Sequence, residues 1–143
     1  MKNLLLILLC MPMIGFGQSW TQTFGGNFDD NARCVQQTVD EGFIIMYQSE
    51  DNSKGICNTY LIKTDENGIQ EWIQNFDTTE YEWFGRCVYQ TADLGYICAT
   101  SSDNGINLVK TDQNGIQQWV QNFGDNIYKA KSIQQTSDGG YVI

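Results

Sequence analysis

The sequence repeats itself, and this repetition restricts the possible folds more than any other feature. Three tryptophans each begin a five-residue block with Gln at its third position and Phe at its fifth: Trp20-Thr-Gln-Thr-Phe24, Trp72-Ile-Gln-Asn-Phe76 and Trp119-Val-Gln-Asn-Phe123. Trp72 follows Trp20 by 52 residues, and Trp119 follows Trp72 by 47. A period of about 50 residues indicates units that bury their apolar faces against neighbouring units.

Three further blocks keep the same order along the chain. Two of them occur in all three copies. The first is a basic-x-Val/Ile-x-Gln-Thr block, which ends at Thr38, Thr91 and Thr136. The second is an acidic turn that precedes an aromatic residue, at Phe43, Tyr96 and Tyr141. The third block, Lys-Thr-Asp-x-Asn-Gly-Ile, begins at Lys63 and Lys110. The repeats therefore span about 20–71, 72–118 and 119–143, and the third is incomplete.

Each full unit contains four short runs with strand chemistry, at about 32–38, 42–48, 59–64 and 69–76 in the first copy. They are rich in β-branched and aromatic residues, and turn residues separate them. Helical periodicity is nearly absent from residues 18–143. Asp65-Glu-Asn-Gly68 favours a type I turn that ends in a left-handed Gly and creates a bulge, and Asp138-Gly-Gly140 and its equivalents are expected to turn in the same way.

We therefore predict an all-β fold of four-stranded antiparallel blades, a partial β-propeller of about 2.5 blades over residues 18–143. Propellers close with about four to eight blades, so the expected context is the N-terminal part of a longer chain that supplies the remaining blades. Assembly of several copies into one ring is the alternative.

Residues 1–17 have the pattern of a signal peptide. Lys2 is followed by an apolar run to Ile14, and Gly15 and Gly17 place small residues before a cleavage site at Gln18. The run is too short to span a bilayer. Lipidation at Cys10 is disfavoured, because the bulky Leu9 precedes it. We expect a secreted or cell-surface protein without a membrane span.

The blocks Trp-x-Gln-x-Phe, Gln-Thr-x-Asp-x-Gly-aromatic and Lys-Thr-Asp-x-Asn-Gly-x-x-x-Trp resemble repeats of large secreted bacterial β-propeller proteins over residues 20–143. Those proteins often carry a sorting domain for type IX secretion. The resemblance implies a propeller and export, and it implies no particular chemistry.

A weaker similarity links Gly68 and Trp72, and Gly115 and Trp119, to the tryptophan-docking repeat of quinoprotein propellers. In that family a hairpin Gly precedes by four residues a Trp that stacks between neighbouring blades. The Thr-Gly-Lys turn of that family is Asn-Gly-Ile here, and no quinone-binding residue is carried over.

Composition excludes several kinds of chemistry. The chain has no His, which removes the commonest general base and metal ligand. Its net charge of −9 opposes nucleic acid and anionic membrane surfaces. Asp65-Glu-Asn-Gly68 matches a backbone-capping turn better than a calcium loop. We predict no catalytic, cofactor-binding or metal-binding residues, and no cofactor.

The aromatic residues are assigned mainly to packing. Trp20, Trp72 and Trp119 are expected to fill the space between blades, where a buried ring removes about 150–250 Å² from water. Trp83, with Glu80 and Glu82 beside Tyr81, is the one acidic-aromatic cluster outside the repeat, and it is the alternative sugar-binding platform.

Four cysteines follow the signal segment: Cys34, Cys57, Cys87 and Cys98. Cys57 falls among extra residues between the second and third predicted strands of the first copy. Buried free thiols and one or two disulfides both remain possible, because an even count outside the cytoplasm permits pairing.

The expected function is a non-enzymatic secreted or surface module that binds a glycan or a protein. The alternative is part of an extracellular enzyme, quinoprotein-like or glycan-active, whose catalytic residues lie on other blades. A remnant without a function of its own is a third hypothesis.

Overall fold

The computed structural model describes residues 20–51, 56–76, 84–102, 105–124 and 129–143. Every regular element within them is a β-strand, which confirms the all-β prediction. The predicted signal peptide and the cluster of Glu80, Glu82 and Trp83 lie outside the described residues.

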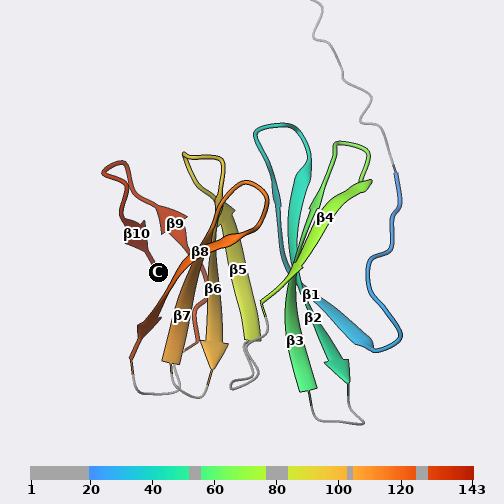
Figure 1. Cartoon of the computed structure of the whole chain (residues 1–143), viewed down its shortest axis with the longest axis horizontal. Helices are drawn as coiled ribbons and strands as arrows, with labels where there is room; N and C mark the ends of the chain where they lie inside the picture. The colour runs from blue at the N-terminus through green and yellow to red at the C-terminus, as the bar shows by residue number, and fades with distance from the viewer. Residues whose placement is uncertain (1–19, 52–55, 77–83, 103–104, 125–128) are drawn as a thin grey trace, which may run out of the picture.

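Two four-stranded antiparallel sheets and one hairpin make up the described chain (Figure 1). The first sheet has the order β1 (Asp29–Gln37), β2 (Phe43–Asp51), β3 (Ile56–Thr64) and β4 (Gln70–Asn75). The second has the order β5 (Phe84–Gln90), β6 (Tyr96–Ser102), β7 (Gly105–Thr111) and β8 (Gln117–Phe123). The hairpin pairs β9 (Gln134–Gln135) with β10 (Tyr141–Val142). Each four-stranded sheet is therefore an open meander in chain order.

The four predicted strands of the first copy are all present, but the position expected for Cys57 is wrong. Cys57 lies within β3 and pairs with Glu50 of β2. The extra residues of this copy lengthen the β2–β3 ladder to nine residues on each strand, against seven in β6 and β7. Additional cross-strand pairs satisfy the backbone of the insertion, which a loop would leave to water.

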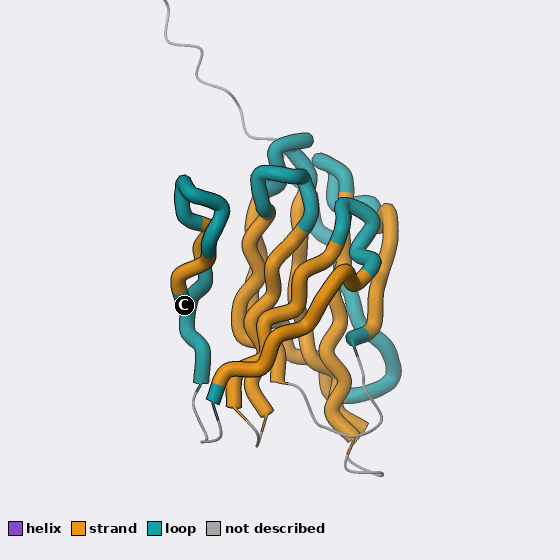
Figure 2. Tube along the Cα trace, turned by 60° about the vertical axis from the view of Figure 1, so that its left-hand side comes forward, coloured by secondary structure: helices purple, strands orange, loops and turns teal. Residues whose placement is uncertain are grey.

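The sheets pack face to face, with β5 against β1, β2 and β3. The core between them is apolar, and the second sheet buries its other face against the third unit around β9 and β10 (Figure 2). The buried residues of the first core are Ile44, Met46, Leu61, Phe76, Val88, Tyr96, Cys98 and Val109. Successive units therefore share cores, as a repeat architecture requires.

The β3–β4 and β7–β8 turns have the predicted form. Gly68 and Gly115 adopt φ values of 77° and 76°, and the ladder register shifts beside each turn. The Asp65 carboxylate accepts hydrogen bonds from the backbone N–H groups of Asn67 and Ile69, and Asp112 repeats this pattern. These aspartates cap their own turns, as the sequence indicated.

The first hairpin differs from the prediction in the first and second units, whereas the third has a left-handed Gly in its turn. The left-handed residue is Glu41, Leu94 or Gly139, one position before the Gly that all copies share. At Gly42 an added Cβ would collide with the Thr64 carbonyl oxygen, and Gly95 meets Thr111 in the same way. The shared Gly is needed for close approach of the neighbouring strand, so it does not supply the positive φ.

The tryptophans lie between units, as expected. Trp72 of β4 meets Tyr96 of β6 edge-on, with ring centroids 5.7 Å apart. Its ring also covers Gly115, where a Cβ would come within 2.7 Å of Trp72 Cζ3. A turn of one unit must therefore remain free of side chain for the ring of the preceding unit to pack.

Replacing Gly115 tests this contact. We expect Gly115→Ala to destabilise the chain by about 2–4 kcal/mol, because it combines left-handed strain with displacement of the Trp72 ring. Urea unfolding measures the change, and Gly26→Ala is the control, since no atom lies within 4 Å of its added Cβ. In a Trp72→Val background the cost of Gly115→Ala should fall by about half; an unchanged cost would show that the ring is not the obstacle.

Candidate ligand-binding cleft

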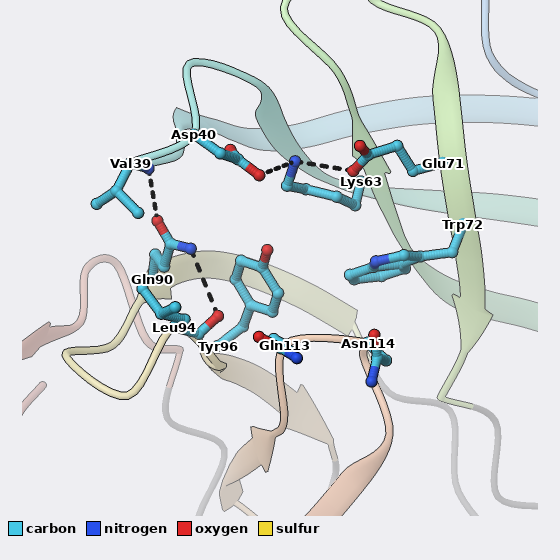
Figure 3. A pocket seen from close by; sticks show the side chains of 10 residues that line it. All are labelled: Val39, Asp40, Lys63, Glu71, Trp72, Gln90, Leu94, Tyr96, Gln113 and Asn114. Carbon is cyan, nitrogen blue, oxygen red and sulfur yellow. Dashed lines mark hydrogen bonds and ion pairs between the residues drawn. The ribbon is translucent and has the colours of Figure 1, made fainter.

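A cleft of about 350 Å³ opens where the two four-stranded sheets meet (Figure 3). The turns that border it lie at one end of the two sheets (Figure 1). Its walls come from the β1–β2, β5–β6 and β7–β8 turns and from β3, β4, β5 and β6. The lining residues are Val39, Asp40, Lys63, Glu71, Trp72, Gln90, Leu94, Tyr96, Gln113 and Asn114.

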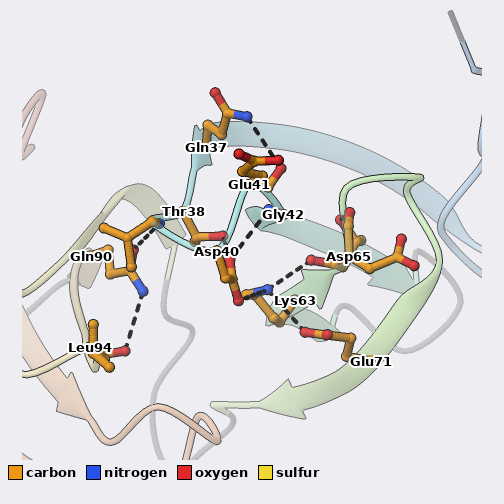
Figure 4. A network of polar contacts seen from close by, with 12 residues as sticks. Gln37, Thr38, Asp40, Glu41, Gly42, Lys63, Asp65, Glu71, Gln90 and Leu94 are labelled. Atoms are coloured by element: carbon orange, nitrogen blue, oxygen red, sulfur yellow. Dashed lines mark hydrogen bonds and ion pairs between the residues drawn. The ribbon is translucent and has the colours of Figure 1, made fainter. Parts of the chain in front are cut away.

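A buried lysine forms one wall of the cleft. Lys63 Nζ lies 2.8 Å from Asp40 Oδ2 and 2.9 Å from Glu71 Oε2, and it donates to the Thr64 carbonyl oxygen at 2.8 Å (Figure 4). An ammonium group has three N–H donors, so these three acceptors use all of them. Lys63 thus links the first turn to the fourth strand.

This network also sets the protonation of its members. Burial alone would lower the pKa of Lys63, but its hydrogen bonds with Asp40 and Glu71 raise that pKa overall. Burial would likewise raise the pKa of Asp40, but Lys63 and the Thr38 hydroxyl hold it below the usual value. Lys63 and Asp40 therefore remain ionised at neutral pH.

The second unit repeats the network. Lys110 Nζ contacts Asp93 Oδ1 and Oδ2 at 3.0 and 2.9 Å and donates to the Thr111 carbonyl oxygen at 2.8 Å. Gln118 Oε1, 3.4 Å away, stands where Glu71 stands in the first unit. The lysine network belongs to the repeat, whereas the second carboxylate is particular to this cleft.

Two aromatic side chains face the cleft from different sheets (Figure 3). Neither the Tyr96 hydroxyl nor the Trp72 indole N–H forms a hydrogen bond with another described residue. Burial is the main cause that raises the pKa of Tyr96, with Asp40 and Glu71 contributing, so its hydroxyl stays protonated. The cleft therefore offers an indole surface and its N–H donor, whereas the Tyr96 ring is almost fully buried beneath it.

Amide groups complete the cleft. Gln90 Oε1 accepts the Val39 backbone N–H at 2.9 Å, and Gln90 Nε2 donates to the Leu94 carbonyl oxygen at 3.4 Å. Gln113 and Asn114 project from the β7–β8 turn on the opposite side. Gln74 Nε2 donates to the Asn114 carbonyl oxygen at 3.3 Å, which holds that turn against β4. The Gln113 side chain remains exposed at the mouth.

The sequence did not reveal this site. The sequence predicted that Trp72 packs between units, and it does so. Part of its indole nevertheless faces the cleft. Gln113 and Asn114 carried only turn signals, and they belong to the unit after the one that provides Lys63. Within the described residues, no group of three or more His, Cys, Asp or Glu is arranged to hold a metal ion, and no helix could cross a membrane.

The cysteines gather in the cores and do not line the cleft. Cys34, Cys57, Cys87 and Cys98 are all free thiols, and only Cys34 is partly exposed. Val88 donates its backbone N–H to Cys34 Sγ at 3.5 Å across the two sheets. Of the two alternatives left open by the sequence, the structure contains the free thiols.

No protein-family model matches the chain, and no curated protein matches it.

Acid should weaken the turn network in a defined range. Thr91 and Lys110 hold the pKa of Asp93 at about 2, below the value of about 3.9 in an unfolded chain. Its contribution to stability is complete above that unfolded value and is lost as the pH falls towards 2. Urea midpoints measured from pH 6 to pH 2 should fall more steeply for the native chain than for Asp93→Asn. Asp138→Asn is the control, because Asp138 keeps the Thr136 and Gly140 hydrogen bonds but contacts no described lysine; equal slopes for all three proteins would contradict the network.

The thiols should be unreactive in the folded chain. Burial, with the nearby Cys34, raises the pKa of Cys87 to about 11, and burial raises the pKa of Cys98 as well. Because the thiolate is the reactive species, alkylation of Cys87 and Cys98 at pH 8 should be slow until urea is added. Intact mass after purification without reductant checks the pairing. A mass lower by two hydrogens would show a disulfide.

Proposed function

We propose that this chain is part of a non-enzymatic, exported β-propeller repeat protein that binds a neutral glycan in the cleft between its two four-stranded sheets. The observation that carries the proposal is the combination of an indole surface with convergent hydroxyl, amide and carboxylate groups at the junction of two rigid sheets. Sugars present both apolar C–H faces and many hydroxyl groups, so they match a site of this mixed character.

The charge of the cleft favours an uncharged ligand. Among the lining residues that the structure describes, Lys63 is the one cation, and all three of its N–H donors already have protein acceptors. A phosphate or carboxylate would meet no available ammonium group, and it would meet the carboxylates of Asp40 and Glu71. The net charge of −9 adds to this repulsion.

The acceptors of the cleft suit hydroxyl donors. Glu71 is bound to Lys63 through Oε2, which leaves Oε1 to accept from a ligand. Asp40 has less acceptor capacity to offer, because its Oδ2 contacts Lys63 and its Oδ1 accepts from the Thr38 hydroxyl and the Gly42 N–H. Hydrogen bonds to charged acceptors are worth about 1.5–3 kcal/mol, more than those between neutral groups. The partly buried Trp72 adds its indole N–H as a donor, so a sugar hydroxyl can both give and accept.

The size of the cleft favours a short saccharide. Its volume of about 350 Å³ is near the lower end of the range for small-molecule sites, about 300–1,000 Å³. The chain ends of a larger glycan could enter while the rest stays in solvent. Export through residues 1–17 would place such a module where extracellular glycans occur.

The proposal is tested by a matched pair of substitutions. Gln113 and Glu66 hold the same position in the β7–β8 and β3–β4 turns, but only Gln113 lines the cleft. A screen against neutral glycans, followed by calorimetry with the best saccharide, should show about two- to tenfold weaker binding for Gln113→Ala, because one hydrogen bond is lost. Glu66→Ala should bind like the native chain.

Two results would refute the proposal. One is the absence of any hit among neutral glycans; the other is equal weakening by both substitutions, which would place the ligand elsewhere. Recovery of the saccharide unchanged after prolonged incubation would support binding without catalysis, and its cleavage would favour the enzyme alternative.

A further inference from the structure

The side of the cleft opposite Trp72 is apolar, although turn residues form it. Val39 and Leu94 line the cleft and are 75% and 46% exposed. Each belongs to the first turn of its unit, where polar residues and Gly are usual. Figure 3 shows these two side chains on one side of the cleft and the Trp72 indole on the other. The cleft therefore presents apolar surface from two sides.

One glutamine holds these two turns together. Gln90 Oε1 accepts the Val39 backbone N–H at 2.9 Å, and Gln90 Nε2 donates to the Leu94 carbonyl oxygen at 3.4 Å (Figure 3). The Leu94 N–H donates to the Thr91 carbonyl oxygen at 2.9 Å. Because these backbone groups already have partners, the surface that this wall presents to a ligand is mainly that of the two hydrocarbon side chains.

The turn itself does not require leucine at position 94. The equivalent residues of the three units are Glu41, Leu94 and Gly139, and they adopt φ values of 67°, 66° and 86°. Gly adopts this left-handed conformation without steric cost, whereas Leu does not. Since nearly half of the Leu94 side chain is exposed, its burial adds little to the stability of the fold. A strained residue with an exposed apolar side chain beside a cleft is typical of a binding site.

The apolar pair is particular to this cleft. At the junction of the second and third units, Ala92 stands at the position of Val39, and Gly139 stands at that of Leu94. Gln135 Oε1 nevertheless accepts the Ala92 N–H at 2.9 Å, as Gln90 accepts that of Val39. The two junctions hold their turns in the same way, so the apolar wall is not needed to join the units.

From this wall we infer that Leu94, together with Val39, selects a neutral saccharide that carries a methyl group, as 6-deoxyhexoses and N-acetylhexosamines do; the inference rests on the proposed glycan site. A methyl group placed against the two side chains is removed from water, which is favourable. A hydroxyl group in the same place would lose hydrogen bonds with water and gain none from hydrocarbon. The wall therefore favours the methyl group and also rejects the hydroxyl group.

Two pairs of neutral sugars test this selection. L-fucose against L-galactose examines the 6-deoxy group, and N-acetylglucosamine against glucose examines the acetyl group. Dissociation constants from NMR titration should favour the methyl-bearing member of at least one pair by about three- to tenfold, the effect of burying one methyl group or slightly more. Leu94→Gly should bring that ratio close to one.

Glu41→Gly is the matched control. Glu41 has the same left-handed position in the first unit, but it is not one of the residues that line the cleft. Its replacement should leave the ratio unchanged. Neither variant should lower the urea midpoint, because Gly relieves the left-handed strain. A midpoint lowered by Leu94→Gly alone would show that the leucine stabilises the fold, and it would overturn the inference.

Gln113→Ala separates this inference from the glycan site itself. Ratios near one for both pairs in the native chain, or a ratio that persists in Leu94→Gly, would overturn the selection by Leu94. If Gln113→Ala still weakens the binding of both members of a pair, the proposed site stands without that selection. If none of the four sugars binds, the site and the selection both fail.

Discussion

The structure depends on the contact that each tryptophan makes with the following unit. A four-stranded sheet with two apolar faces cannot be stable alone, so each unit has to present a surface that its neighbour covers. The indole of Trp72 spans that junction and meets an aromatic ring and a glycine of the next sheet. The same geometry recurs at Trp119 and Tyr141, with centroids 6.0 Å apart. The fourth strand of one unit provides the indole ring, and the next sheet provides the aromatic residue and the glycine that it packs against. The contact therefore fixes both the order and the separation of the units.

The tryptophan contact also explains where a polar cleft can form between two sheets whose facing surfaces are apolar. The ring packs near the tight turns, and there the sheets carry Lys63 and Lys110 within their buried third strands. A buried ammonium group needs acceptors, and the repeat provides an aspartate from the first turn and a residue from the fourth strand. The polar network therefore forms at the mouth of the junction. The ring below it excludes water from the core, and the space above it remains open.

The sequence predicted the strands, their antiparallel order and the packing role of the tryptophans, because period, turn residues and aromatic spacing are local signals. It failed where one residue has two possible explanations. The shared Gly42 signalled a left-handed turn, whereas its actual role is the approach of the Thr64 carbonyl, which belongs to a distant strand. Cys57 was placed in a loop because an insertion does not show whether it lengthens a ladder. The cleft was missed for a similar reason, since its residues come from two units and meet only through the packing of the sheets.

The repeat separates residues that maintain the architecture from residues that can vary. Lys63, Thr64 and Asp65 recur as Lys110, Thr111 and Asp112, with the same hydrogen bonds. The positions around the cleft mouth do not recur: Glu71 becomes Gln118, Glu66 becomes Gln113, and Val39 becomes Ala92. A change at these positions alters charge and shape at a junction without disturbing the lysine network or the tryptophan contact. Each junction between units can therefore differ in charge and shape on the same framework, and a few turn residues at each junction decide that difference.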